Sequence, residues 1–207
     1  MKVCIYGAGA IGGYLGALLA GTDCELTLIA RGPHLAAMQA KGLTLIEESG
    51  ERTVKVRATD DPRQAGPQDY VILALKAHSV APILGQLAPL LGPDTAVVTA
   101  QNGILWWYFH GLEGPYAGRR LESADPGGRI WAALGPERAI GCVVYPSCEI
   151  VSPGTAWITV PTVCTSRPGR SRGVNRAIAS RPTCGASNGA AAAGSTTRTP
   201  SAGTLTR

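Results

Sequence analysis

The sequence predicts an α/β fold with a mostly parallel, doubly wound sheet, followed by a disordered tail. Apolar runs of strand length alternate with helical stretches over residues 1–160, the pattern of parallel strands joined by crossover helices. The first run leads directly into the glycine-rich stretch GAGAIGG, as in the first turn of a Rossmann-like sheet. Beyond about residue 160 both patterns stop, and small polar residues, Pro and Arg dominate.

Each expected element is a stretch whose pattern and length fit it. Apolar runs of strand length occur at 2–6, 25–30, 70–75, 95–100, 140–146 and 156–160. The runs 43–47 and 53–57 flank EESGE and predict a β-hairpin inserted into the alternation. Helices are expected at 10–20, where small residues favour close packing on a sheet, at 33–40, with Pro first and Gly42 just beyond the end, and at 80–91, limited by Pro82 and Pro89.

The charge of the chain is unevenly distributed. It holds 19 Lys and Arg against 14 Asp and Glu, a formal net charge of +5. Seven of the arginines lie beyond residue 150, where no acid occurs, so residues 1–149 keep 12 basic and 14 acidic side chains. The basic character therefore belongs to the tail, and the folded part is not expected to bind nucleic acid specifically.

The cysteines, the histidines and the hydropathy predict a cytoplasmic protein with no metal site and no membrane partner. The six cysteines form no CxxC pair and no ligand spacing with histidine, which favours reduced thiols. The first residues read as a strand rather than a leader, and no apolar run approaches the roughly 18 residues of a membrane span. The three histidines, His34, His78 and His110, lack ligand or triad spacing and are expected to be solvated or loosely packed.

The stretch 7–12 has the G-x-G-x-x-G spacing of a dinucleotide-binding turn. It follows a predicted strand and opens a predicted helix, which is the required context. Gly7 would allow the tight turn, Gly9 the close approach of a pyrophosphate, and Gly12 the contact between helix and strand. Free N–H groups at the helix start would bind the phosphates. The predicted cofactor-binding residues here are Gly7, Ala8, Gly9, Ala10, Ile11 and Gly12; the alternative is a glycine turn that only packs.

The end of the second strand indicates which dinucleotide is bound. NAD sites usually place an acid about 20 residues after the glycine turn, on the ribose 2′-hydroxyl. This chain instead has Ile-Ala-Arg, with Arg31 able to pair with a 2′-phosphate. The sequence therefore predicts NADP(H), and a solvated surface arginine is the alternative.

Two more polar residues follow predicted strands and are expected at the same edge of the sheet. Lys76 interrupts the apolar run LALKAHSV, and Asn102 lies in TAQNGI. Open α/β sheets bind ligands at the carboxyl ends of their strands, so both are predicted to contact cofactor and substrate. A lysine turned to solvent and a plain Asn-Gly turn are the alternatives. The aromatic stretch 104–111 could wall a substrate cleft, pack on a partner domain or form a local cluster.

Four segments together resemble the N-terminal domain of the ketopantoate reductases (2-dehydropantoate 2-reductases). They are, in chain order, GAGAIGGYLG, LIARGPHL, LALKAHSV and AQNGI. The later stretch from WWYFHGLEGPY to GRIWAALGPERAIGCVVYP is similar to one branch of that family. The resemblance implies a Rossmann NADP domain followed by an all-helical domain, with NADPH-dependent reduction of the 2-keto acid 2-dehydropantoate to pantoate in the cleft between them. By this resemblance, Lys76 and Asn102 would line the nicotinamide and substrate side.

The family's general-acid lysine comes from the helical domain, whereas this chain has no Lys after Lys76 and no acid after Glu149. No catalytic residue is therefore assigned, and the chain is expected to be an impaired reductase that exposes an interdomain face prone to self-association. The predicted domains are an NADP-binding domain at 1–160 and a disordered basic tail at 161–207. The composition of the tail is that of GC-rich coding sequence read out of frame, which suggests a frameshift near residues 155–165. There are three alternatives. The tail could be an evolved disordered segment, the chain could be a non-catalytic NADP(H)-binding module with a basic interaction tail, or a partner chain could supply the missing helices.

Overall fold

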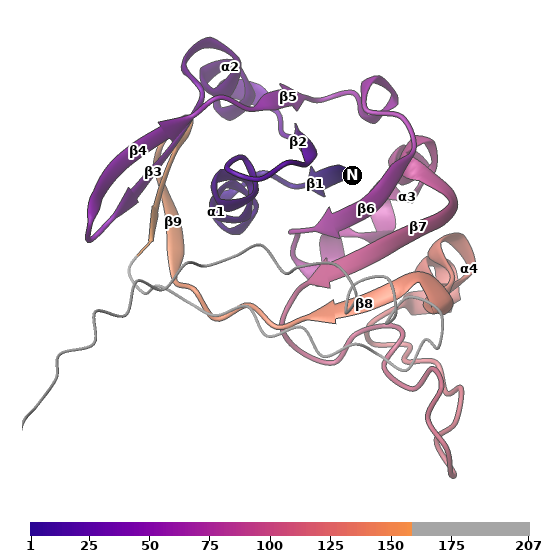
Figure 1. Cartoon of the computed structure of the whole chain (residues 1–207). Coiled ribbons are helices and arrows are strands. Elements are labelled where there is room, and N and C mark those ends of the chain that lie inside the picture. The colour runs from indigo at the N-terminus through magenta and orange to yellow at the C-terminus, as the bar shows by residue number, and fades with distance from the viewer. Residues whose placement is uncertain (159–207) are drawn as a thin grey trace, which may run out of the picture.

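The computed structural model describes residues 1–158. Six parallel strands form the main sheet (Figure 1). The strand order is β5-β2-β1-β6-β7-β8, which is the order of a classical dinucleotide-binding sheet and confirms the predicted Rossmann-like fold. Every neighbouring pair runs parallel. The bounds are β1 Lys2–Tyr6, β2 Glu25–Ile29, β5 Arg57–Thr59, β6 Gln68–Leu73, β7 Leu91–Ala100 and β8 Ala139–Cys142.

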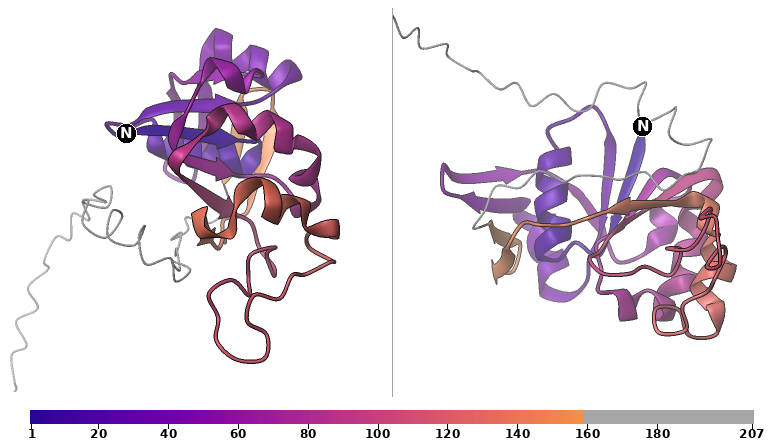
Figure 2. Two further views of the ribbon diagram at one scale, coloured as in Figure 1. Left: turned by 90° about the vertical axis from the view of Figure 1, so that its right-hand side faces the viewer. Right: turned by 90° about the horizontal axis from the view of Figure 1, so that it is seen from below.

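Two hydrophobic cores lie on opposite faces of the main sheet. Because side chains alternate along a strand, Val3 and Ile5 of β1 enter one core, while Cys4 and Tyr6 enter the other. The first core is covered by α1 (Ala10–Leu19) and α2 (Gly32–Lys41), and the second by α3 (Leu84–Leu87) and α4 (Arg129–Leu134). Figure 2 shows α1 and α4 on opposite sides of the sheet. The sheet is therefore doubly wound, as predicted.

A second sheet covers the outer side of α1. Its strand order is β4-β3-β10-β9, with bounds β3 Leu43–Glu47, β4 Gly50–Val54, β9 Cys148–Ser152 and β10 Thr155–Ile158. Gly13 and Gly16 let the helix approach both layers: a Cβ at Gly16 would lie 2.9 Å from the Leu28 side chain of β2 and 3.6 Å from the Leu43 side chain of β3. The small residues of α1 thus allow a helix to lie between two sheets (Figure 1).

The predicted hairpin is present, but its second run is divided between the two sheets. Residues 50–54 pair with β3 in antiparallel register, whereas Arg57 already belongs to β5 of the main sheet. The expected single strand 53–57 was therefore wrong. The chain changes sheets at residues 55–56, which a pattern of alternating residues does not reveal.

The stretch 80–91 is helical only in short pieces. A 3-10 turn at Ala81–Ile83 precedes α3, and a second at Ala88–Leu90 follows it. Pro82 and Pro89 each lie at the start of one of these turns. Proline removes the amide that a continuing helix would use and clashes with the preceding turn, so the prolines divide the stretch. The remaining 3-10 turns are Pro62–Gln64, Ala77–Ser79, Pro126–Gly128 and Pro136–Arg138.

The helix α4 and the strand β9 were not predicted from the sequence. The short helix α4 depends on Asp125, whose two carboxylate oxygens accept hydrogen bonds from the backbone N–H groups of Ile130 and Trp131. The middle of the segment 101–128 before it projects away from the sheet (Figures 1 and 2), whereas Trp106 and Asp125 are buried. The strand β9 is largely exposed and obtains its partner only from β10.

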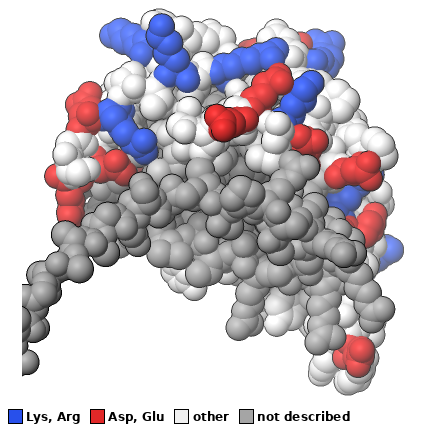
Figure 3. Space-filling model, viewed as in Figure 1, with Lys and Arg blue, Asp and Glu red and all other residues white. Residues whose placement is uncertain are grey.

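The surface of the described residues carries both signs of charge. Figure 3 shows Lys and Arg interspersed with Asp and Glu on the face drawn. Within residues 1–158, none of the helices has the length and apolar character required to cross a bilayer. The predicted disordered tail, 161–207, and the end of the predicted strand 156–160 lie outside the described residues.

We expect Leu43→Ala to lower the free energy of unfolding by about 2–5 kcal/mol, because it leaves a cavity between α1 and the second sheet. Leu18→Ala is the matched control, because Leu18 of α1 is 42% exposed, and it should change stability by less than about 0.5 kcal/mol. Urea titration of both variants measures the difference. Similar losses in the two variants would contradict the packing of α1 between the two sheets.

Candidate functional site

The predicted site residues follow the carboxyl ends of four neighbouring strands. In the order of the sheet, Arg31 follows β2, the stretch 7–12 follows β1, Lys76 follows β6 and Asn102 follows β7. Neighbouring strands lie about 4.8 Å apart, so the row extends over about 14 Å. The strand order reverses between β1 and β6, and ligands of open α/β sheets bind at such a point.

The glycine turn is fixed by its own backbone. The N–H groups of Gly7 and Ala8 both donate to the carbonyl of Ile29, at 3.1 and 2.9 Å, which joins the ends of β1 and β2. Gly7 has a φ of +96°, a conformation that disfavours any side chain. A Cβ at Gly12 would overlap the Gly7 carbonyl oxygen. Gly7 and Gly12 are thus required by the fold.

Gly9 differs from these two glycines, because nothing in the described structure requires it. Its φ is −79°, and a Cβ built there would meet no atom within 4 Å. The N–H groups of Ala10, Ile11 and Gly12 begin α1 and donate to no carbonyl within residues 1–158. Gly9 therefore leaves open space beside a helix N-terminus with free donors, which suits an anion such as a pyrophosphate.

Arg31 stands at the start of α2 with an exposed side chain that makes no hydrogen bond or ion pair within the described residues. Burial raises the pKa of the neighbouring Tyr6, and the negative charge of an ionised Cys4 would raise it further. The positive charge of Arg31 acts in the opposite direction and lowers the pKa of Tyr6. The hydroxyl of Tyr6 donates to Oε1 of Gln86 at 2.5 Å. Arg31 is thus a free cation beside the glycine turn.

Lys76 and Asn102 differ in how far they are free to bind a ligand. Lys76 is exposed, and its side chain has no hydrogen-bond or ion-pair partner within residues 1–158. The Asn102 amide instead bonds twice to Val144, donating to its carbonyl at 2.8 Å and accepting from its N–H at 2.9 Å. Asn102 therefore connects the ends of β7 and β8 here, and a ligand role for it stays a prediction.

Gln101 belongs to the same edge and was missed by the sequence analysis. Its side-chain amide donates to the carbonyl of Leu75 at 2.7 Å and is almost fully buried. This bond fixes the backbone directly before Lys76. The signal in the sequence was a polar residue at the end of an apolar strand, but the prediction named the next residue, Asn102, instead.

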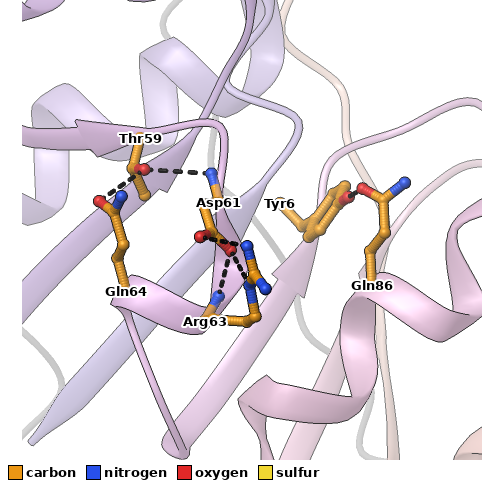
Figure 4. Close-up of polar contacts among 6 residues, drawn as sticks. All are labelled: Tyr6, Thr59, Asp61, Arg63, Gln64 and Gln86. Carbon is orange, nitrogen blue, oxygen red and sulfur yellow. Dashed lines mark hydrogen bonds and ion pairs between the residues drawn. The ribbon is translucent and has the colours of Figure 1, made fainter.

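An open pocket of about 460 Å³ lies beside the carboxyl end of β5 and is lined by Asp60, Asp61, Pro62, Arg63, Gly85, Gln86 and Pro89. Figure 4 shows the polar contacts around it. Asp61 forms two hydrogen bonds with the guanidinium of Arg63, and these bonds hold its pKa below the usual range. Asp60 and the paired Asp61 and Arg63 give this pocket no net positive charge, so phosphate groups are better placed at the glycine turn and Arg31.

His34 is not the loosely packed histidine that the sequence analysis expected. Its Nδ1 accepts a hydrogen bond from the N–H of Gly154 at 2.9 Å, and its Nε2 is buried. The partner is 120 residues away in the sequence, so spacing gave no signal. Within residues 1–158, no three His, Cys, Asp or Glu side chains are grouped so that they could hold a metal ion.

Comparison with known proteins gives a consistent family. Residues 3–105 match the sequence profile described as ketopantoate reductase PanE/ApbA. The chain is 57% identical over 155 residues to a 2-dehydropantoate 2-reductase of Mesorhizobium japonicum, covering 74% of this chain and 48% of that protein. It is 39% identical over 104 residues to a 2-dehydropantoate 2-reductase of Pyrococcus horikoshii, covering 50% of this chain and 34% of the other.

A solved structure agrees with these sequence matches. The PanE/ApbA family ketopantoate reductase of Ralstonia eutropha superposes with a TM-score of 0.67 at 31% identity, covering 86% of this chain and 52% of that one. The chain thus spans about half the length, or less, of the proteins that it matches. The similarity covers the part of the chain that carries the four strand ends.

Substitutions of Gly9 and Gly12 should distinguish an effect on ligand binding from an effect on folding. We expect Gly9→Ala to leave the unfolding temperature unchanged but to weaken dinucleotide binding by about tenfold or more, because the methyl group enters the space beside the helix N-terminus. Gly12→Ala should destabilise the fold itself, because its methyl group meets the Gly7 carbonyl. Thermal unfolding and fluorescence titration with NADPH measure both effects. Unchanged binding in folded Gly9→Ala would contradict the role of this space.

Proposed function

Because the N-terminal domain of this chain belongs to the ketopantoate reductase family, we propose that it binds NADPH for the reduction of 2-dehydropantoate to pantoate. The Rossmann fold and the family together imply a nicotinamide cofactor. The choice of NADPH, the keto acid substrate and the roles of individual residues are part of the proposal.

The observation that carries the proposal is the row of four strand ends with two unpaired cations. The helix N-terminus at 10–12 is suited to the pyrophosphate, and Arg31 on the neighbouring strand end to a 2′-phosphate. Lys76 lies on the other side of the glycine turn, on the strand end of β6. A dinucleotide laid along this row would thus meet donors and positive charge at each phosphate position.

The reduction needs a hydride and a proton, and this chain contributes to binding more than to proton transfer. Bound NADPH supplies the hydride to the keto carbon. The glycine turn and Arg31 hold the phosphates, and Lys76 offers positive charge on the side expected for the carboxylate or carbonyl of the substrate. By resemblance to the family, the proton comes from a lysine that lies beyond the Rossmann domain, and no lysine follows Lys76 in these 207 residues.

The boundary near residue 160 and the disorder of 161–207 remain proposals, because those residues lie outside the described part of the chain. Self-association also remains a proposal. Its support is the set of exposed apolar side chains in the projecting segment 101–128, namely Ile104, Tyr108, Leu112 and Tyr116. Exposed apolar groups on one segment favour association with another surface.

Arg31→Ala should weaken NADPH binding by about 10- to 100-fold, because one charge-assisted contact to the 2′-phosphate is lost. Binding of NADH, which has no 2′-phosphate, should hardly change. Lys41→Ala is the control, since it removes one exposed positive charge from the other end of the same helix. Fluorescence titration with both cofactors gives the result. Equal affinity of the unaltered chain for NADPH and NADH would refute the assignment.

A protein consisting of these 207 residues should bind NADPH but reduce 2-dehydropantoate very slowly. Loss of general-acid catalysis alone costs about 10²- to 10⁴-fold in rate. The assay follows NADPH oxidation with and without 2-dehydropantoate, and NADPH binding is measured in parallel on the same sample. Substrate-dependent turnover at about 1–10 s⁻¹, an ordinary enzyme rate, would show that these residues complete the site themselves.

A further inference from the structure

His34 forms a hydrogen bond with a segment far from its own helix. It lies in the first turn of α2, three residues after Arg31. Its Nδ1 accepts from Gly154 in the turn between β9 and β10. One side chain thus connects the Arg31 turn to the second sheet, and that sheet packs on α1 directly after the glycine turn.

The hydrogen bond to Gly154 determines the tautomer of His34. Burial lowers the pKa of His34, and the backbone of Ala8 only partly opposes this, so the ring is neutral near neutral pH. A neutral imidazole has one donor and one acceptor nitrogen. Because Nδ1 accepts from Gly154, the proton lies on Nε2, which is buried and has no hydrogen-bond partner within the described residues.

The Gly154 turn provides a fixed point for this connection. Its carbonyl accepts a hydrogen bond from the N–H of Thr44 in β3 at 2.8 Å. Its φ is +79°, and a Cβ built there would lie 3.0 Å from the Cβ of Ala37 in α2. The turn is therefore anchored to β3 and packs closely on α2. A shift of the first turn of α2 relative to the second sheet would break the bond to His34.

We infer that His34 is a positioning residue that holds the Arg31 turn and the glycine turn in register for a single dinucleotide. The inference rests on the proposed NADPH binding. NADPH would meet both turns at once, through its 2′-phosphate and its pyrophosphate, so their relative position affects its affinity. NADH lacks the 2′-phosphate, and its binding should depend much less on where the Arg31 turn lies.

The test compares three substitutions of His34. His34→Leu removes both nitrogens at similar bulk, His34→Asn keeps an acceptor near the position of Nδ1, and His34→Gln keeps polar atoms near Nε2 instead. We expect His34→Leu to weaken NADPH binding about tenfold and NADH binding less than about twofold. His34→Asn should recover most of the NADPH affinity, and His34→Gln should recover less, because the bond to Gly154 is the anchored one.

The control is His110→Leu, because His110 lies in the segment 101–128 against Trp131, and it should leave both affinities unchanged. Titrations are made well below the unfolding temperature of each variant, which thermal unfolding determines. Unchanged NADPH affinity in His34→Leu, or equal losses for NADPH and NADH, would overturn the inference while the proposed function stands. An unaltered chain that binds neither cofactor would contradict both the proposed function and the inference.

Discussion

The close approach of helix α1 to the glycine turn is the constraint on which the rest of the structure depends. A side chain at Gly12 would overlap the Gly7 carbonyl, so the helix can begin where it does only with glycine there. The same helix meets β2 through Gly16 and the second sheet through Gly13. Larger residues at these positions would move the helix and separate the two sheets. The position of the helix N-terminus, and so of its free N–H groups, follows from this packing.

The charges along the sheet edge are arranged so that the middle of the row suits an anion. The dipole of α1 contributes positive potential there, as do the side chains of Arg31 and Lys76, which have no partner within residues 1–158. The carboxylates of Asp60 and Asp61 lie further out, beside the end of β5. Binding of an anionic dinucleotide is thereby favoured at the glycine turn rather than at the outer pocket, with no need for a net basic surface.

Polar side chains at this edge are largely used to hold the backbone. Gln101 fixes the residue before Lys76, Asn102 joins two strand ends, and His34 joins α2 to the β9–β10 turn. For Asn102, the two bonds to Val144 fix the orientation of its amide. Residues such as these affect binding through the geometry of their neighbours, which distinguishes them from Arg31 and Lys76.

The sequence by itself determined the parallel sheet and the edge at which the candidate site residues lie, because strand periodicity and the glycine spacing of 7–12 are local properties of the chain. It could not determine where residues 53–57 change sheets or that β9 pairs with β10, because pairing joins distant segments. Only the tertiary structure showed that Gly9 is free of packing while Gly12 is not, and that His34 meets Gly154. Such contacts depend on how the layers pack, and packing leaves no periodic signal in the sequence.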